Sequence, residues 1–555
     1  MPSRHRSLVL LLALLGAVAL LAAVTAPPPA PAPPTDAGGV RLVVLVFFDQ
    51  LRGDYLGRWR DEFGPGGFRR LCDDGAWFAD CHYPYAYTVT AAGHASVASG
   101  CPPADHGVVG NEWYDRQAGK AVNCVGSARG PSPERLLKPV LGDAIKAGTG
   151  GRGKVVGLSL KDRGAILPVG RRADAAYWLD TGAGKFVTSP FYRDAPHPWV
   201  AEFNAEKPAD RWRGGRWERL RPDLDYAALS GPDDGPGEGD GAAGQGKTFP
   251  HPFEPADPKK KPAYGSAVYT SPFGNDLLLA FAERAITAER LGADDTPDLL
   301  AVSFSSNDAV GHAWGPDSQE VLDVTLRSDR VVRRLLAVLD ARVGRGRYVL
   351  AMTADHGICP LPEVSRERGL DAARVQPVTA KKVREFLDEK YGEGAGKWAE
   401  SAGVPWVYLN DRAITAARQK PAEVEAALAG WAAGQDGVER VLTRGELTGG
   451  VPADDRIGQM VRRSYFPGRC GELYVLLKPY HLPSAALGSG TTHGSPWEYD
   501  THVPLVVYGA GVVPGVREDR VTPLAAAAIL SRAAGVAPPA GATTPVPDGL
   551  FSDDQ

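Results

Sequence analysis

Residues 40–49 read VRLVVLVFFD. They indicate a class of fold and also the edge of its sheet at which a functional site should lie. The run Val40–Phe48 is mostly apolar and rich in β-branched side chains, which is the pattern of a strand buried on both faces. It ends in Asp49, and open α/β sheets place their ligand sites at the carboxyl ends of their strands. Taken alone, an aspartate in this position is more often the start of a turn.

Further stretches of the same kind alternate with helical patterns along the chain. Apolar runs of strand length are predicted at 154–160, 298–304, 347–353, 472–477 and 503–508. Between them, residues 271–291 and 318–340 carry apolar side chains at helical spacing. Strands that alternate with helices are typical of an α/β fold, so we expect a largely parallel central sheet flanked by helices.

Two segments interrupt this alternation, and we interpret them as insertions. Residues 186–265 are rich in Gly, Pro, Trp and Asp and contain the run GPDDGPGEGDGAAGQGK, which predicts a cap with a mobile loop outside the core. Residues 376–470 show helical patterns but nothing that looks catalytic. The predicted core then comprises three parts and a tail, at 40–185, 266–375, 471–540 and 541–555.

The first 26 residues have the pattern of a secretory signal peptide. A basic start at residues 4–6 precedes an apolar run over 8–24, and residues 24–26 (VTA) form a small-residue cleavage site. The Pro/Ala-rich residues 27–39 predict a stiff linker. The alternative is an uncleaved anchor, since the apolar run approaches the length of a bilayer span. We expect a periplasmic or secreted protein with no other membrane segment.

Composition and charge exclude several classes of protein. Of the 555 residues, 43% are hydrophobic and 23% are charged, which is a globular rather than a disordered composition. The formal net charge is −4, so nucleic acid is not an expected partner, and any important positive charge must be local. Six cysteines permit disulfides in an exported chain, but their pairing cannot be read from the sequence. We expect a monomer.

Residues 88–100, TVTAAGHASVASG, contain a candidate nucleophile. Small residues follow Thr90 and allow a helix to begin at once, so its hydroxyl would lie at or near a helix N-terminus. Free N–H groups and the helix dipole favour negative charge there, which suits a nucleophilic oxyanion or a phosphate. On this stretch alone, a simple N-cap role for Thr90 is favoured about two to one.

Three polar side chains elsewhere could contact an anion. Asn111 follows a glycine, which by itself is usually turn chemistry. Lys161 and Arg163 follow the predicted strand at 154–160 and would share one face of an extended backbone. Two cations aimed the same way repel each other unless an anion lies between them. The alternative is a solvated strand end, and the two interpretations are about equal on this evidence alone.

Carboxylates and histidines collect at the ends of other predicted strands. Asp308 and His312 stand four residues apart, which places both on one side of a helical turn. Asp355 and His356 are adjacent at a strand end, and His493 lies in a glycine-rich loop. Together with Asp49, this set offers nitrogen and oxygen ligands for two zinc sites.

These residues stand in seven motifs in a fixed order along the chain. The motifs are FFD ending at Asp49, T-x-A-G-H beginning at Thr90, G-N-E around Asn111, L-K-D-R at 160–163, ND-x3-H ending at His312, ADHG at 354–357 and THGS at 492–495. Their order resembles the alkaline phosphatase superfamily. It is most similar to the threonine-nucleophile branch, the phosphate-irrepressible alkaline phosphatases, which are relatives of nucleotide pyrophosphatase/phosphodiesterases. The resemblance runs from about residue 42 to the C-terminal helix, whereas the two insertions resemble that branch only loosely.

The resemblance implies an alkaline-phosphatase-like fold and a role for each motif residue. It implies one zinc ion on Asp308, His312 and His493. It implies a second zinc ion on Asp49, Asp355 and His356, with Thr90 as an additional ligand. Contacts to the phosphoryl oxygens would come from Asn111, Lys161 and Arg163. The expected activity is that of an exported two-zinc alkaline phosphatase, which hydrolyses small-molecule phosphate monoesters through a phosphothreonine at Thr90.

Three other functions remain as alternatives. The nearest is a phosphodiesterase or nucleotide pyrophosphatase on the same scaffold. A diester carries one charge fewer, so two cations at Lys161 and Arg163 favour a monoester. A sulfatase is disfavoured because Thr90 stands where such enzymes carry a modified Cys or Ser. A non-catalytic zinc-binding exported protein is disfavoured by the intact ligand set.

Overall fold

The computed structural model describes residues 39–241, 243–254, 264–393, 397–483 and 489–552. The predicted signal peptide and the linker up to residue 38 lie outside the described residues. Within the described part of the chain, no helix combines the length and the apolar character that crossing a membrane requires. All six cysteines fall in this part, and each is buried and unpaired, so the disulfides that the even count permitted do not form here.

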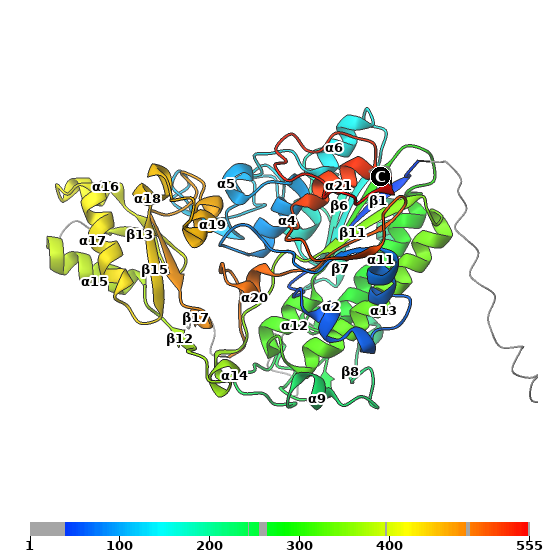
Figure 1. Cartoon of the computed structure of the whole chain (residues 1–555), viewed down its shortest axis with the longest axis horizontal. Helices are drawn as coiled ribbons and strands as arrows, with labels where there is room; N and C mark the ends of the chain where they lie inside the picture. Colours follow the sequence, from blue (N-terminus) through cyan, green and yellow to red (C-terminus); the bar gives the residue numbers. More distant parts are fainter. Residues whose placement is uncertain (1–38, 242, 255–263, 394–396, 484–488, 553–555) are drawn as a thin grey trace, which may run out of the picture. The chain divides into compact units, whose positions relative to one another are not determined.

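A nine-stranded sheet forms the centre of the molecule (Figure 1). Its spatial order is β19 (Gly515–Arg517), β2 (Ala76–Phe78), β18 (Leu505–Gly509), β11 (Tyr348–Thr353), β1 (Leu42–Phe48), β10 (Asp298–Phe304), β5 (Val155–Ser159), β6 (Ala175–Asp180) and β7 (Lys185–Val187). Strands β11, β1, β10, β5 and β6 run parallel, whereas β18 and β7 pair antiparallel at either side. The predicted largely parallel sheet is therefore confirmed.

Helices cover both faces of this sheet, which explains why its strands are apolar throughout (Figure 1). All seven residues of β1 are buried. Helices α4 (Thr90–Ser99), α6 (Leu141–Gly148) and α21 (Ala525–Ala533) form one layer, and the short α7 (Asp162–Ile166) contacts α4. Helices α11 (Pro272–Ala288), α12 (Ser306–Trp314) and α13 (Gln319–Arg342) form the other.

The first insertion contributes to the main core, contrary to the prediction of a cap with a mobile loop. Its elements are α8 (Pro198–Ala205), η2 (Pro208–Trp212), β8 (Arg216–Trp217), α9 (Tyr226–Ser230), β9 (His251–Pro252) and α10 (Tyr264–Tyr269). Trp217 and Phe253 belong to the same hydrophobic cluster as β1, and Trp217 Nε1 donates to Asp323 Oδ2 of α13 at 2.7 Å. Within the glycine-rich run, Glu238 and Gln245 are buried. Aromatic packing against α13 therefore anchors a segment whose composition suggested a loose loop.

The second insertion has a four-stranded sheet and a hydrophobic cluster of its own. The sheet order is β13 (Ala399–Ala402), β14 (Trp406–Leu409), β16 (Leu473–Leu477) and β15 (Val438–Thr443), and the sheet packs with α15 (Ala380–Tyr391), α16 (Asp411–Ala416) and α17 (Pro421–Ala433). The assignment of 472–477 to the central sheet was wrong, because this strand pairs with β14 and β15. Leu473 and Val475 lie in the cluster of the insertion.

Shorter elements connect these parts. They are α2 (Tyr55–Arg58), η1 (Arg60–Glu62), α3 (Phe68–Asp74), α5 (Pro103–His106), β3 (Glu112–Asp115), β4 (Lys120–Asn123), α14 (Pro362–Glu367), β12 (Ala373–Val375), α18 (Arg444–Gly449), α19 (Arg456–Ser464), β17 (His481–Pro483) and α20 (Glu498–Thr501). Helix α19 packs the second insertion against the main core, because its Met460 and Val461 belong to the main hydrophobic cluster.

Candidate active site

The carboxyl ends of four neighbouring parallel strands bring the predicted site residues together. Strands β11, β1, β10 and β5 are adjacent and run in one direction, so their carboxyl ends share one edge of the sheet. Asp49 directly follows β1, and Asp355 comes two residues after β11. Lys161 comes two residues after β5, and β10 leads into α12, which carries Asp308.

One group of possible metal ligands consists of Asp308, His312 and His493. One ligand atom from each lies within 4.8 Å of the others. The Nε2 atom of His312 lies 3.1 Å from Asp308 Oδ1, and that of His493 lies 3.7 Å from the same oxygen. Nδ1 of His312 donates to the carbonyl of Thr491, and Nδ1 of His493 donates to that of Thr88, both at 2.8 Å. These backbone contacts leave Nε2 of each ring free to bind a metal.

The second group consists of Asp49, Asp355 and His356, which are all fully buried. His356 Nε2 lies 3.5 Å from Asp49 Oδ1 and 3.4 Å from Asp355 Oδ2, while its Nδ1 donates to the carbonyl of Gly357 at 2.9 Å. Neither Asp49 Oδ1 nor Asp355 Oδ2 has a hydrogen-bond partner among the described residues. Buried carboxylate oxygens without partners fit a cation site, because their burial is otherwise costly.

The electrostatics of the two groups also fit divalent cations. The ammonium of Lys161 lies 2.6 Å from Asp49 Oδ2 and 2.6 Å from Asp308 Oδ2, between the groups. Burial, together with the nearby Asp308 and Asp355, raises the pKa of Asp49 well above its usual range. At Asp308, the charges of Lys161 and His312 outweigh burial and lower the pKa well below that range. The carboxylates of Asp49 and Asp308 thus meet at one ammonium, and a buried cluster this rich in carboxylates has the chemistry of a divalent-cation site.

Lys161 and Arg163 do not share a face of an extended strand, contrary to the prediction. Strand β5 ends at Ser159, whose Oγ accepts from the backbone N–H of Lys161 at 3.0 Å, and Lys161 is the N-cap residue of α7. Arg163 lies inside that helix, where its buried Nε has no partner among the described residues. The turn into the helix directs Lys161 between the two carboxylate groups.

Thr90 is the first residue of α4, as predicted, but it does not cap the helix. The N-cap residue is Val89, and no side chain accepts a capping bond there. Thr90 Oγ1 lies 3.4 Å from His356 Nε2, beside the second ligand group. Asn111 Oδ1 accepts from the N–H of Ala91 at 2.9 Å, so its side chain also lies at the start of α4. The N-cap interpretation of Thr90 was therefore wrong.

Two further side chains that sequence reasoning did not select lie against the carboxylates. Gln50, with a left-handed φ of 71°, donates from Nε2 to Asp308 Oδ1 at 2.8 Å and from its backbone to Asp355 Oδ1 at 3.1 Å. His94 Nδ1 donates to the carbonyl of Thr90 at 2.8 Å and lies 3.3 Å from Asp355 Oδ2. The only signals for them were the motif FFD, which directly precedes Gln50, and the motif T-x-A-G-H, which ends in His94.

Comparisons with known proteins assign the chain to a family. The family model described as type I phosphodiesterase/nucleotide pyrophosphatase matches residues 43–495. The chain belongs to this family. One relative, alkaline phosphatase PhoV of Synechococcus elongatus, is 34% identical, and the alignment covers 87% of this chain and 88% of the PhoV chain. Another, alkaline phosphatase PafA of Elizabethkingia meningoseptica, is 33% identical with coverages of 86% and 88%.

Solved structures of PafA match the fold over most of both chains. Wild-type PafA superimposes with a TM-score of 0.85 at 29% identity, and covers 93% of this chain and 100% of its own. A PafA variant that carries substitutions at one threonine, one asparagine, one lysine and one arginine matches with a TM-score of 0.86 at 30% identity. The family assignment and these matches confirm the resemblance to the alkaline phosphatase superfamily and the α/β fold that it implied.

Proposed function

We propose that the protein is an exported alkaline phosphatase that hydrolyses phosphate monoesters through a phosphothreonine on Thr90, with two zinc ions as cofactors. The observation that carries the proposal is the placement of Thr90 and Lys161 against two groups of three ligand side chains at one edge of the sheet. Relatives named alkaline phosphatase that align over most of the chain support the same activity.

Each metal-binding group has a donor set suited to zinc. Asp308, His312 and His493 would hold one ion, and Asp49, Asp355 and His356 the other, because zinc takes imidazole nitrogen and carboxylate oxygen ligands. Bound there, the two ions would supply Lewis acidity that favours the ionised hydroxyl of Thr90 and neutralises charge on the reacting oxygens. The hydroxyl of Thr90 lies near enough to His356 to act as an additional ligand.

The side chains of this site act as the nucleophile and as donors to the phosphoryl group. Thr90 Oγ1 attacks phosphorus, and the ester oxygen leaves in line with the attack. Asn111, Lys161 and Arg163 donate to the phosphoryl oxygens, where negative charge is greatest in the transition state. Water then attacks the phosphothreonine from the opposite side and releases inorganic phosphate. Two successive inversions retain the configuration at phosphorus.

The PafA variant supports the grouping of the proposed catalytic residues. Its four substitutions fall on the same residue types as Thr90, Asn111, Lys161 and Arg163, and its substituted lysine and arginine are two positions apart, as they are here. A set that was altered together in a relative of the same fold is consistent with one functional unit.

Steady-state kinetics on a phosphate monoester and a matched diester test the substrate class. We expect kcat/KM for the monoester to be at least about 10²-fold higher, since one or two charge-assisted contacts account for a factor of this size. The same sample serves for measurement of its zinc content. A preference for the diester would overturn the proposal and favour the phosphodiesterase alternative.

Two variants of Thr90 test the nucleophile. Thr90→Ala should lose most turnover while it remains folded, whereas Thr90→Ser keeps a hydroxyl and should retain a measurable part. Phosphate should be trapped on Thr90 in acid-quenched wild-type protein and be absent from the alanine variant. If the alanine variant turned over monoester nearly as fast as wild type, Thr90 would not be the nucleophile.

A further inference from the structure

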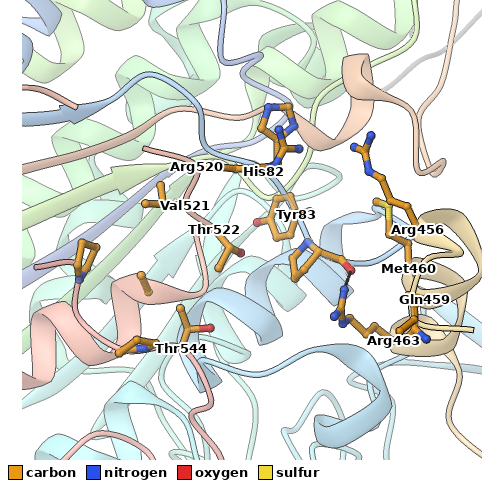
Figure 2. Close-up of a pocket in the computed structure, with 15 residues that line it drawn as sticks. His82, Tyr83, Arg456, Gln459, Met460, Arg463, Arg520, Val521, Thr522 and Thr544 are labelled. Carbon is orange, nitrogen blue, oxygen red and sulfur yellow. Dashed lines mark hydrogen bonds between the residues drawn. The ribbon is translucent and has the colours of Figure 1, made fainter. Parts of the chain in front are cut away.

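A pocket of about 580 Å³ lies between helix α19 and the C-terminal part of the chain, and no proposed catalytic or metal-binding residue lines it (Figure 2). One wall is a face of α19 that presents Arg456, Gln459, Met460 and Arg463 at the spacing of neighbours on a helix surface. The opposite wall includes Tyr83 and Arg520. A volume of this size is within the range of about 300–1,000 Å³ that is typical of small-molecule sites.

The floor of the pocket is apolar and held in place. Tyr83, Met460 and Ala525 are almost fully buried. The hydroxyl of Tyr83 donates to the carbonyl of Ala354 at 2.8 Å, and the carbonyl of Met460 accepts from the N–H of Ala86 at 3.0 Å. Both walls are thus tied to the main core, so the pocket is preformed. The apolar surface open to a ligand comes from Pro84, Ala453, Pro545 and Pro547, which also line the pocket.

Three guanidinium groups line the pocket, and one of them is paired with a carboxylate. The guanidinium of Arg456 has no ion pair or hydrogen bond with any other described residue, and Arg463 donates only to the neutral carbonyl of Pro84, at 3.2 Å. Arg520 lies 3.4 Å from Asp80 and is half exposed. His82 adds no charge at neutral pH, because burial lowers its pKa to about 4. The pocket is therefore locally positive in a protein of net charge −4.

The spacing of the arginines defines the shape of a suitable ligand. Arg456 and Arg463 are seven residues apart on one helix, so their Cα atoms lie about 10 Å apart along its axis. Two cations on one face of a pocket with an apolar lining complement a molecule that carries negative charge at both ends of a flat apolar body. A simple phosphate monoester, in contrast, concentrates its charge on one phosphoryl group.

We propose that this pocket binds a small dianion whose two anionic groups stand about 10 Å apart on an apolar, preferably aromatic, body. The two guanidiniums of α19 bind the anionic ends, Arg520 adds a third positive charge, and the body packs on the apolar lining of the pocket. The site is separate from the proposed zinc centre and does not depend on the catalytic proposal.

Isothermal titration of the purified full-length protein tests this site. The probe is naphthalene-2,6-dicarboxylate, and naphthalene-2-carboxylate is the probe with a single charge. We expect the dicarboxylate to bind wild-type protein about tenfold more tightly than the monocarboxylate, as one charge-assisted contact allows. Arg456→Gln and Arg463→Gln should each raise the Kd of the dicarboxylate about tenfold, and bring it close to that of the monocarboxylate.

Arg462→Gln is the matched control. Arg462 lies on the same helix and carries the same charge, but it does not line the pocket, so its variant should bind the dicarboxylate like wild type. Thermal unfolding of all three variants establishes that they fold, as expected for exposed arginines. Equal affinities for Arg456→Gln, Arg463→Gln and wild type would overturn the proposal. So would the absence of measurable binding to wild type, or a dicarboxylate that competes with the monoester substrate.

Discussion

Replacing Gly93 by alanine should displace the start of helix α4 and lower monoester turnover. A Cβ at this position would lie 2.1 Å from the carbonyl oxygen of Asp355 and 2.7 Å from its carbonyl carbon, whereas real Cβ contacts essentially never fall below 3.0 Å. These two atoms belong to the backbone and the third close atom is Asp355 Cβ at 2.7 Å, so the neighbour cannot move aside as the far end of a flexible side chain would. Helix α4 and the segment after β11 must therefore separate by about 1 Å. Thr90 stands on α4, and Asp355 lies in the segment that follows β11.

The size of the effect follows from this displacement. A misplacement of about 1 Å at a reacting group costs about 10²-fold in rate, which is about 2.7 kcal/mol on the activation barrier. Stability should change less, because the gain of about 1 kcal/mol for alanine over glycine within a helix partly offsets an overpacking cost of about 1–3 kcal/mol. We therefore expect kcat/KM to fall about 10²-fold, with a net destabilisation of about 0–2 kcal/mol.

Gly430→Ala provides the matched control. Gly430 lies within α17, and a Cβ there would meet no heavy atom within 4 Å. This variant should be as active as wild type and more stable by up to about 1 kcal/mol. The assay is kcat/KM on a phosphate monoester, with urea unfolding of the same samples. If Gly93→Ala matched Gly430→Ala in both activity and stability, the contact between α4 and Asp355 would not position the nucleophile.

Three further predictions concern metals, charge and pH. A chelator should abolish turnover, zinc should restore it, and the purified protein should hold about two zinc ions per chain; full activity in metal-stripped protein contradicts this. Lys161→Ala should lower monoester kcat/KM about 10²-fold and diester turnover much less. Arg163→Ala should lower monoester kcat/KM further, because the planar guanidinium binds two phosphoryl oxygens. Equal losses on monoester and diester would refute the proposal that these two residues select monoesters. Urea unfolding should show that protonation of His106 in the unfolded chain removes about 1.6 kcal/mol of stability between pH 6.5 and 5. Burial lowers the pKa of His106 to about 3, whereas the unfolded chain takes up this proton near pH 6.5, so stability falls as pH drops. The stability of His106→Asn should therefore depend less on pH over this range. A pH dependence equal to that of wild type would contradict the prediction.

The site residues near strand ends could be predicted from the sequence, because the patterns that indicate them lie within a few residues of each other. The buried run before Asp49 and the pair Asp355-His356 combine a recognisable strand with residue types that bind metals. Asp308 and His312 needed only the period of one helical turn. The turn after β5 was predicted wrongly, because the choice between an extended chain and a helix at Lys161 depends on a hydrogen bond from its N–H to Ser159 that composition does not reveal.

The sequence alone thus determined the α/β class, the order of the motifs and the residue types available for catalysis, since strand and helix periodicity and ligand chemistry are properties of short stretches. Only the tertiary structure decided which groups meet. Gln50 contacts Asp308, a residue 258 positions away, and Gly93 touches the backbone of Asp355. The first insertion packs into the core through Trp217, and the pocket lined by Arg456, Arg463 and Arg520 lies where α19 faces the C-terminal segment. Contacts of this kind depend on how the whole chain packs, because burial and close approach are set by side chains distant in sequence.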